Sequence, residues 1–267
     1  MSKKILIALL CFVIAVISRA QMSREDSAKQ TEVWSPEPPI VTPGATPQEP
    51  PSDAIILFDG KNLDQWRSSK DSTKPAEWTV SSGLLTVNKK AGDIQTKQRF
   101  TDYQLHLEWR IPENIHGEGQ SRGNSGVFLA ELGSGGDGEG YEIQVLDCYN
   151  NKTYINGQTG SVYKQIIPLA NACKKPGEWQ TYDIIWTAPR FNEDGSLKSP
   201  ARVTVLHNGV LLQNNAELKG VTRYIGAPSY KKHGPLPIDL QAHGDPSEPI
   251  SYRNIWVRPL PVQIVNE

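Results

Sequence analysis

The sequence has little of several features that mark particular protein classes. It contains 3 cysteines and 5 histidines, and its formal net charge is −1 at pH 7. A protein that binds nucleic acid through phosphates needs a concentrated basic face, which this balance does not supply. The histidines are scattered along the chain without close metal-ligand spacing, and two mature cysteines alone do not make a zinc site. We therefore expect no nucleic-acid partner and no zinc site built on the cysteines.

Long apolar runs are also scarce, apart from one at the N-terminus. Residues 5–17 are uninterruptedly apolar, follow the basic Lys3 and Lys4, and precede the small residues Ser18 and Ala20. This order is typical of a secretory signal peptide, and the run is too short to span a bilayer permanently. We expect residues 1–20 to be removed, which predicts an exported protein, periplasmic or secreted, with no membrane insertion afterwards.

Proline divides the remaining chain. Residues 21–52 are polar and contain seven prolines, which predicts a disordered leader or linker. Residues 53–260 are long enough for one domain with a sizeable core, and residues 261–267 form a tail. Cys11 leaves with the signal, so Cys148 and Cys173 remain either as a disulfide or as two buried thiols.

The folded part lacks sustained helical periodicity and internal repeats. It shows short alternating or apolar runs separated by turn residues, which is typical of strands. Asn208-Gly209 is a strong hairpin signal, and Gly83 marks a second turn. With tryptophans to fill an interior, these runs predict an all-β protein of two packed antiparallel sheets. We expect strands near residues 54–58, 78–80, 84–87, 103–111, 127–130, 141–146, 181–186, 202–206, 238–242 and 254–257.

Three of these strands carry polar side chains on the face opposite their apolar residues. Glu142 and Gln144 alternate with Tyr141, Ile143 and Val145 in the run "YEIQVLD". Residues 105–111 and 238–243 repeat the division. If the three strands share a sheet, one face is core and the other gathers carboxylates, amides and an imidazole, which can bind sugar hydroxyls. An ordinary solvated face is the alternative.

A pair of catalytic carboxylates within the strand is disfavoured. Without a bulge, Asp147 points away from Glu142 and lies about 16 Å along the strand from it. A retaining glycosidase needs its two carboxyl groups about 5–5.5 Å apart. A serine nucleophile elbow of the Gly-x-Ser-x-Gly type is also missing.

Several motifs taken in order resemble one known family, the 3-keto-disaccharide hydrolases. They cover about residues 53–260 and are "LFDGKNLDQW" (57–66), "LEWRIPE" (107–113), "NSGVFL" (124–129), "YEIQVLD" (141–147), "KPGEWQTYDIIWTAPRF" (175–191), "ARVTVLHNGVLLQ" (201–213) and "GPLPIDLQAHGDP" with "YRNIWVRPL" (234–260). The resemblance implies a concanavalin A-like or laminarinase-like jelly-roll sandwich.

The resemblance also implies an enzyme that acts on a carbohydrate whose sugar already carries a ketone at C3. Such a ketone acidifies the C2 hydrogen, so a base can form an enediolate and the group at C1 can leave by elimination, followed by hydration. The site then needs a base, donors at the C3 oxygen and an acid near the leaving oxygen. Direct hydrolysis of the glycosidic bond remains an alternative. So does a non-catalytic carbohydrate-binding module on the same fold.

The chemistry assigns roles to nine residues. Glu142 or His243 is expected to be the base. Asp147 orients either His243 or the asparagine-rich loop that follows it, or, if a bulge turns it inward, acts as the acid. The remaining candidates bind substrate: Arg253 at the oxyanion with Arg122 and Asn124 as its neighbours, and Glu108, Gln144 and Gln241 at sugar hydroxyls. No cofactor is required on this reading, although Glu108, Glu142 and His243 would be the ligands of a divalent metal. The oligomeric state is not predicted.

Overall fold

The computed structural model describes residues 23–133 and 139–261. The predicted signal peptide therefore lies outside the described residues, as do residues 134–138 and nearly all of the predicted tail. The chain divides into two compact units, Met1–Ile40 and Val41–Glu267. In the first, α2 (Arg24–Lys29) is capped by Ser23, whose side chain accepts a hydrogen bond from the Asp26 amide. Across the described ranges, no helix is long and apolar enough to cross a membrane.

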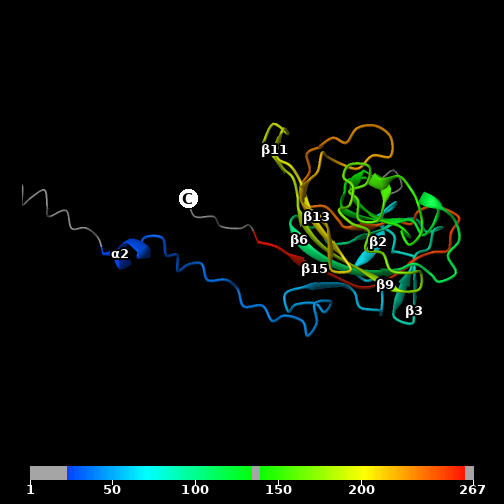
Figure 1. Ribbon diagram of the computed structural model, residues 1–267, viewed down its shortest axis with the longest axis horizontal. Helices are drawn as coiled ribbons and strands as arrows, with labels where there is room; N and C mark the ends of the chain where they lie inside the picture. The colour runs from blue at the N-terminus through cyan, green and yellow to red at the C-terminus, as the bar shows by residue number, and fades with distance from the viewer. Residues whose placement is uncertain (1–22, 134–138, 262–267) are drawn as a thin grey trace, which may run out of the picture. The chain divides into compact units, whose positions relative to one another are not determined.

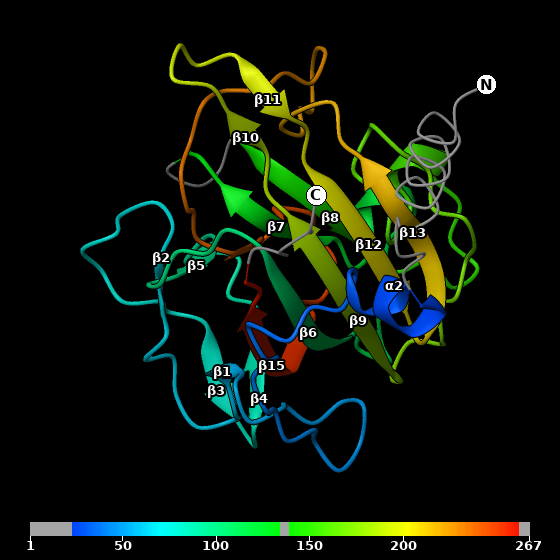
Figure 2. The ribbon, with the colours of Figure 1, turned by 90° about the vertical axis from the view of Figure 1, so that its left-hand side faces the viewer.

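The second unit is a sandwich of antiparallel strands, which confirms the predicted fold class (Figure 1). The larger sheet has the order β13-β12-β9-β6-β15-β4-β3, and β1 pairs with β15. Its strands are β1 (Ile55–Phe58), β3 (Thr79–Ser81), β4 (Leu84–Thr86), β6 (Tyr103–Arg110), β9 (Trp179–Thr187), β12 (Arg202–His207), β13 (Val210–Glu217) and β15 (Ser251–Pro259). In Figure 2, β9, β12 and β13 run side by side.

The smaller sheet has the order β2-β5-β14-β7-β8. Its strands are β2 (Trp66–Ser68), β5 (Ile94–Thr96), β7 (Ser125–Glu131), β8 (Gly140–Val145) and β14 (Asp239–Leu240). A separate hairpin joins β10 (Arg190–Phe191) to β11 (Leu197–Ser199). Two 3₁₀ turns, η1 (Gly119–Ser121) and η2 (Ile155–Gly157), lie in the connections before β7 and after β8.

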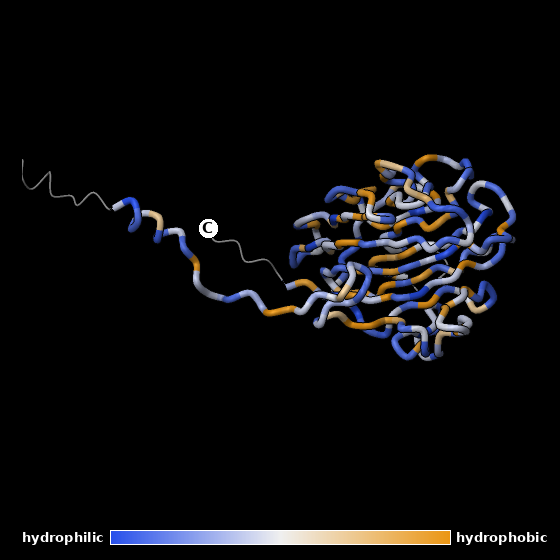
Figure 3. The backbone as a smooth tube through the Cα atoms, turned by 60° about the horizontal axis from the view of Figure 1, so that its bottom comes forward, coloured by the Kyte–Doolittle hydropathy of each residue, from blue (hydrophilic) through white to orange (hydrophobic). Residues whose placement is uncertain are grey.

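The core lies between the two sheets. Hydrophobic and hydrophilic residues alternate along the strands that enclose it (Figure 3). On β9 the buried residues alternate with partly or fully exposed ones, so this strand has one solvent face. Two tyrosines cross the interior, because the Tyr103 hydroxyl donates to the Leu129 carbonyl and the Tyr182 hydroxyl to the Gln144 carbonyl. These bonds satisfy phenolic groups that would otherwise be buried without partners.

Both predicted turns have the backbone that their sequences require. Asn208 and Gly209 have φ angles of 52° and 79°, which are the positive values of a two-residue hairpin, and they join β12 to β13. Ser82 and Gly83 likewise have φ angles of 51° and 76° between β3 and β4.

The predicted leader contributes to the second unit from Val41 onward. Thr42 and Ser52 bond to each other through backbone and side chain, which closes a loop. At its tip the Gln48 carbonyl accepts hydrogen bonds from the Trp256 indole at 3.0 Å and the Asn254 amide at 2.9 Å. This loop therefore binds to β15, which the polar composition of the segment did not indicate.

Cys148 and Cys173 form a disulfide, which resolves the two alternatives left by the sequence. The bridge connects the segment that follows β8 to the segment that precedes β9. Its partners are 25 residues apart in the chain. The disulfide thus anchors the end of the strand that carries Glu142 and Gln144 to the larger sheet.

Candidate active site

A cavity of about 650 Å³ lies on the outer face of the smaller sheet. This volume is within the usual range of small-molecule sites, roughly 300–1,000 Å³. Strands β7 and β8 and the segment after β14 supply one wall, and the irregular segments around η1 and η2 and near residue 222 supply the rest. The lining residues are Gln120, Ser121, Asn124, Phe128, Glu142, Gln144, Tyr154, Tyr163, Lys164, Thr222, Tyr224, Gln241 and His243.

Glu142 and Gln144 reach this cavity because β8 alternates. Tyr141, Ile143 and Val145 belong to the core, as predicted, so the two polar residues point to the opposite face. The Glu142 carboxyl lies over Gly126 of the neighbouring β7, where an added Cβ would stand 2.7 Å from Oε1. A side chain at position 126 would therefore displace the carboxyl.

The Glu142 carboxyl group is an acid in its neutral form at neutral pH. It is 5% exposed, and no described residue donates a hydrogen bond to it. Burial, reinforced by the nearby carboxylates of Asp93 and Glu131, raises the pKa of Glu142 to about 8. A group with this pKa can donate a proton at pH 7, as a general acid requires.

His243 is held by the carboxylate of Asp245, which is ionised, whereas the Glu142 carboxyl is neutral. Its Nδ1 lies 3.0 Å from Asp245 Oδ2 and 3.2 Å from the Asp245 amide nitrogen. Although burial acts to raise it, hydrogen bonds from His243, Ser247 and Lys89 lower the pKa of Asp245 to about 2. Two groups compete for Nδ1, because the Asp245 amide is placed to donate to it whereas the ionised carboxylate can only accept from it. The contact with the carboxylate is the shorter of the two, so we assign the imidazole proton to Nδ1, which leaves Nε2 as the acceptor.

Amide side chains form a hydrogen-bonded group beside His243. Asn124 Nδ2 lies 3.4 Å from His243 Nε2 and donates to the Gln120 carbonyl at 2.8 Å. Its Oδ1 accepts a hydrogen bond of 2.8 Å from Gln144. The Gln241 Oε1 atom is buried and has no hydrogen-bond partner within residues 23–133 and 139–261. It is therefore an available acceptor for a ligand hydroxyl.

The opposite wall is aromatic and was not predicted from the sequence. Tyr154 and Tyr163 share a hydrogen bond of 2.6 Å between their hydroxyls, and Tyr224 joins them at the cavity. Lys164 lies among these three rings. The residues come from irregular segments, in which no period indicates direction. The one available signal was the concentration of aromatic and basic residues in a long connection, where binding residues are common.

The structure brings together five of the nine predicted site residues. Asn124, Glu142, Gln144, Gln241 and His243 all line the cavity.

Asp147 and Arg122 lie beside the cavity without lining it. β8 ends at Val145, and Arg122 Nε is 2.7 Å from Asp147 Oδ2 in a nearly buried ion pair. Burial raises the pKa of Asp147 and outweighs the Tyr149 amide and Arg122, which lower it. The predicted contact between Asp147 and His243 is replaced by the contact with Asp245. Asp147 thus holds the Arg122 loop against the end of β8.

Glu108 and Arg253 belong to the other sheet, which corrects the expectation of one shared polar face. β6 and β15 pair with each other in the larger sheet, whereas β8 and β14 belong to the smaller one. Both sheets turn their apolar sides to one core, so their polar faces point to opposite sides of the sandwich. Arg253 Nε contacts Glu108 at 2.6 Å and its guanidinium stacks on Trp179.

The same separation breaks up the predicted metal ligands. Glu108 is on the far face, so it cannot share an ion with Glu142 and His243. Within the part of the chain that the structure describes, no cluster of three or more histidine, cysteine, aspartate or glutamate side chains is placed to hold a metal ion.

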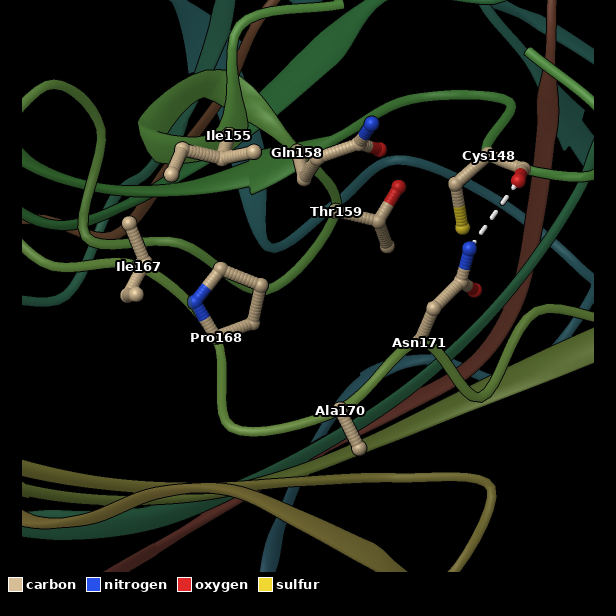
Figure 4. Close-up of a pocket in the computed structure, with 8 residues that line it drawn as sticks. All are labelled: Cys148, Ile155, Gln158, Thr159, Ile167, Pro168, Ala170 and Asn171. Atoms are coloured by element: carbon tan, nitrogen blue, oxygen red, sulfur yellow. Dashed lines mark hydrogen bonds between the residues drawn. The ribbon is translucent and has the colours of Figure 1, made fainter. Parts of the chain in front are cut away.

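A second cavity, of about 290 Å³, lies behind the η2 turn (Figure 4). Ile155, Ile167 and Pro168 face Cys148 and Asn171 across it, and the Asn171 amide donates to the Cys148 carbonyl. Its lining contains no acid or base, because Cys148 is in the disulfide. This second cavity therefore offers no acid–base pair of its own.

Comparison with known proteins identifies the family of the chain. The sequence model of a family described as the 3-keto-alpha-glucoside-1,2-lyase-like domain matches residues 53–258. A curated relative, a 3-keto-disaccharide hydrolase of Bacteroides thetaiotaomicron, is 27% identical over 157 residues. That match covers 49% of this chain and 51% of the relative, so this chain spans only about half the length of the relative.

Solved structures resemble the whole sandwich. A candidate glycosyl hydrolase from Parabacteroides distasonis is 58% identical, with a TM-score of 0.81, and the match covers 90% of this chain and 98% of that one. A second candidate glycosyl hydrolase from the same organism is 22% identical, with a TM-score of 0.55 over 78% of this chain and 99% of that chain. The second likeness shows the fold alone.

Proposed function

The chain belongs to the family of 3-keto-alpha-glucoside-1,2-lyase-like domains, and we propose that it cleaves the glycosidic bond of 3-keto-glycosides. Membership of this family makes it a glycoside hydrolase-like, carbohydrate-active protein. We propose further that the reaction is an elimination across C1 and C2 followed by hydration. The enzyme would act after export, which the N-terminal sequence and the disulfide support.

One observation carries the proposal: a single cavity holds the neutral carboxyl group of Glu142 and the imidazole of His243, which the ionised carboxylate of Asp245 orients. The pKa of Glu142 is raised to about 8, whereas His243 is oriented by an aspartate whose pKa is about 2. Environments that drive the pKa values of two carboxyl groups apart in this way leave the proton on Glu142 and the negative charge on Asp245, beside His243. An elimination needs such an unlike pair, whereas a retaining glycosidase needs two close carboxyls.

The first step is proton abstraction. His243 Nε2 takes the hydrogen from C2 of the sugar, and the electron pair left on C2 moves toward the C3 carbonyl to give an enediolate with its negative charge on O3. Asp245 stabilises the resulting imidazolium because its carboxylate accepts the Nδ1 proton's hydrogen bond.

The second step expels the group at C1. The enediolate reforms the C3 carbonyl, a C1–C2 double bond forms, and the bond from C1 to the leaving oxygen breaks. Glu142 donates its proton to that oxygen, so the leaving group departs as a neutral alcohol. Water then adds across the double bond with its hydroxyl on C1 and a proton on C2, and the proton balance returns both residues to their starting states.

Sugar recognition fits the remaining lining residues. Gln144, Gln241 and Asn124 present amide groups that bind hydroxyls. The three tyrosines offer ring faces for the apolar side of a pyranose. These aromatics also favour the second candidate function, a carbohydrate-binding module without catalysis, since lectin-like sites stack sugars on exposed rings.

The decisive experiment measures aglycone release from a chromogenic 3-keto-glucoside, with the parent glucoside as the control substrate. We expect turnover of the ketone only, and a drop of about 10²- to 10⁴-fold in kcat for His243→Gln. His116→Gln is the matched control, because His116 is exposed and bonds to Glu248 outside the cavity. Saturable binding of sugar by the wild type without turnover would establish the binding module instead.

Reaction in D₂O separates elimination from direct hydrolysis. Elimination followed by hydration places deuterium at C2 of the released sugar, whereas direct hydrolysis leaves the C2 hydrogen in place. Proton NMR during early turnover, corrected for exchange of the free product without enzyme, distinguishes the two.

A further inference from the structure

Lys164 is placed at the cavity wall by a constrained backbone. Its φ angle is 57°, a left-handed conformation that side chains other than glycine, asparagine and aspartate rarely adopt. The Lys164 amide donates to the Asn156 carbonyl at 2.8 Å, and the next two amides both bond to Val162. The neighbouring backbone therefore holds this residue in an unfavourable conformation, which is a frequent property of functional segments.

The ammonium group is surrounded by aromatic rings. Lys164 Nζ lies 4.2 Å from the ring centroid of Tyr224 and 5.7 Å from those of Tyr154 and Tyr163. It donates one hydrogen bond, of 2.7 Å, to the Tyr224 carbonyl. An ammonium has three N–H donors, so two remain for a ligand. The rings stabilise the charge by cation–π contact without neutralising it.

Charge pairing distinguishes Lys164 from the basic residues that surround the cavity. Arg122 pairs with Asp147, and Lys89 pairs with Asp245. For Lys164, no carboxylate of the described residues lies within 4.0 Å of Nζ, and the carboxyl that shares its cavity, Glu142, is neutral at pH 7. The cavity thus contains a cation with no fixed counter-charge, an arrangement that favours a ligand in which negative charge develops.

We propose that Lys164 binds the C3 oxygen of the substrate and stabilises the negative charge that forms there in the enediolate. This role rests on the proposed function, and it gives to Lys164 the task that the sequence assigned to Arg253. Lys164 forms and breaks no covalent bond. Its hydrogen bond to O3 strengthens as charge moves from C2 to O3, so it lowers the barrier to abstraction of the C2 proton.

The test uses a ligand that can enolise but cannot eliminate. In 3-keto-1,5-anhydroglucitol C1 carries no exocyclic leaving group, so deuterium exchange at C2 in D₂O reports proton abstraction without loss of an aglycone. We expect the wild type to catalyse this exchange and Lys164→Met to slow it by about 10²- to 10³-fold, the usual effect of removing one oxyanion donor. Aglycone release from the 3-keto-glucoside should fall by the same factor in kcat, with KM changed much less.

Two further variants separate charge from structure. Lys164→Arg keeps a cation at the wall and should recover at least a tenth of the exchange rate. Lys219→Met removes an exposed lysine that does not line the cavity, so this variant should behave as the wild type. Thermal unfolding of all variants checks that loss of the bond to Tyr224 has not disrupted the fold.

The outcomes are distinct. Exchange by Lys164→Met within threefold of the wild-type rate, or equal loss in Lys164→Met and Lys164→Arg together with a lowered melting temperature, overturns the role of Lys164 and leaves the proposed function standing. A wild type that neither exchanges C2 nor releases aglycone overturns the proposed function, and this role with it.

Discussion

Each of the two polar faces of the sandwich carries a buried glutamate, and the pKa values of these two glutamates are shifted in opposite directions. Glu108 on β6 and Glu142 on β8 each alternate with core residues, and they are 6% and 5% exposed. Burial acts to raise the pKa of Glu108, but hydrogen bonds from His106, Asn254 and Arg253 lower it to about 2. Glu142 has no such donor in the described chain, and burial raises its pKa to about 8.

The difference shows that the hydrogen-bond and ion-pair partners of a buried carboxyl group, and not its burial alone, decide whether it is ionised or neutral. On the larger sheet the carboxylate is ionised and bonded to Arg253, whose guanidinium lies over the Trp179 ring. Such a group stabilises structure and has no proton to give. On the smaller sheet the carboxyl keeps its proton and faces a cavity. We therefore expect acid–base chemistry on the face of the smaller sheet, where the buried carboxyl of Glu142 has no hydrogen-bond donor or cation as its partner in the described chain.

The largest effect expected from this comparison is on turnover. Glu142→Gln should lower kcat on a 3-keto-glucoside by about 10²- to 10⁴-fold, because the amide keeps the shape but has no acidic proton. Glu108→Gln, the matched substitution on the other face, should change kcat by less than about threefold. Steady-state aglycone release measures both, and a greater loss from the Glu108 variant would reverse the assignment of the two faces.

The two glutamates should also affect the free energy of unfolding at opposite ends of the pH range. Glu142 has a raised pKa, so its contribution to stability is complete below about pH 4.5 and is lost as pH rises toward 8. Glu108 has a lowered pKa, so its contribution is complete above about pH 4.5 and is lost as pH falls toward 2.

Denaturant unfolding of the wild type and each glutamine variant measures these contributions. The stability difference between wild type and Glu142→Gln should change by up to about 1.4 kcal/mol per pH unit between pH 5 and 8. The corresponding difference for Glu108→Gln should be constant there and change only in acid. A flat difference for Glu142 throughout would show that its carboxyl is ionised in the folded protein.

The smallest effect concerns Arg253, which the sequence placed at the oxyanion. Arg253→Met removes the ion pair to Glu108 and the contact with Trp179, and should lower the free energy of unfolding by about 2 kcal/mol. Turnover below the melting temperature should stay within about threefold of wild type. A kcat loss of 10²-fold without loss of stability would return Arg253 to the active site.

Prediction from the sequence worked where local periodicity carries the information. Alternation along β8 correctly placed Glu142 and Gln144 away from the core, and the Asn208-Gly209 turn was correctly predicted. It failed for Glu108 because alternation tells which side of its own strand a residue occupies, and not to which sheet the strand belongs. Lys164 was missed because its segment has no regular period.

The sequence by itself determined the all-β class, the family, and the residue types that meet a sugar. Those properties depend on local patterns and motifs, which a chain displays before it folds. Only the tertiary structure decided that Asp245 and not Asp147 orients His243, that Glu142 is neutral and Glu108 ionised, and that Lys164 lies among three tyrosines. These depend on contacts between residues distant in the chain, because pairing and desolvation set a group's charge.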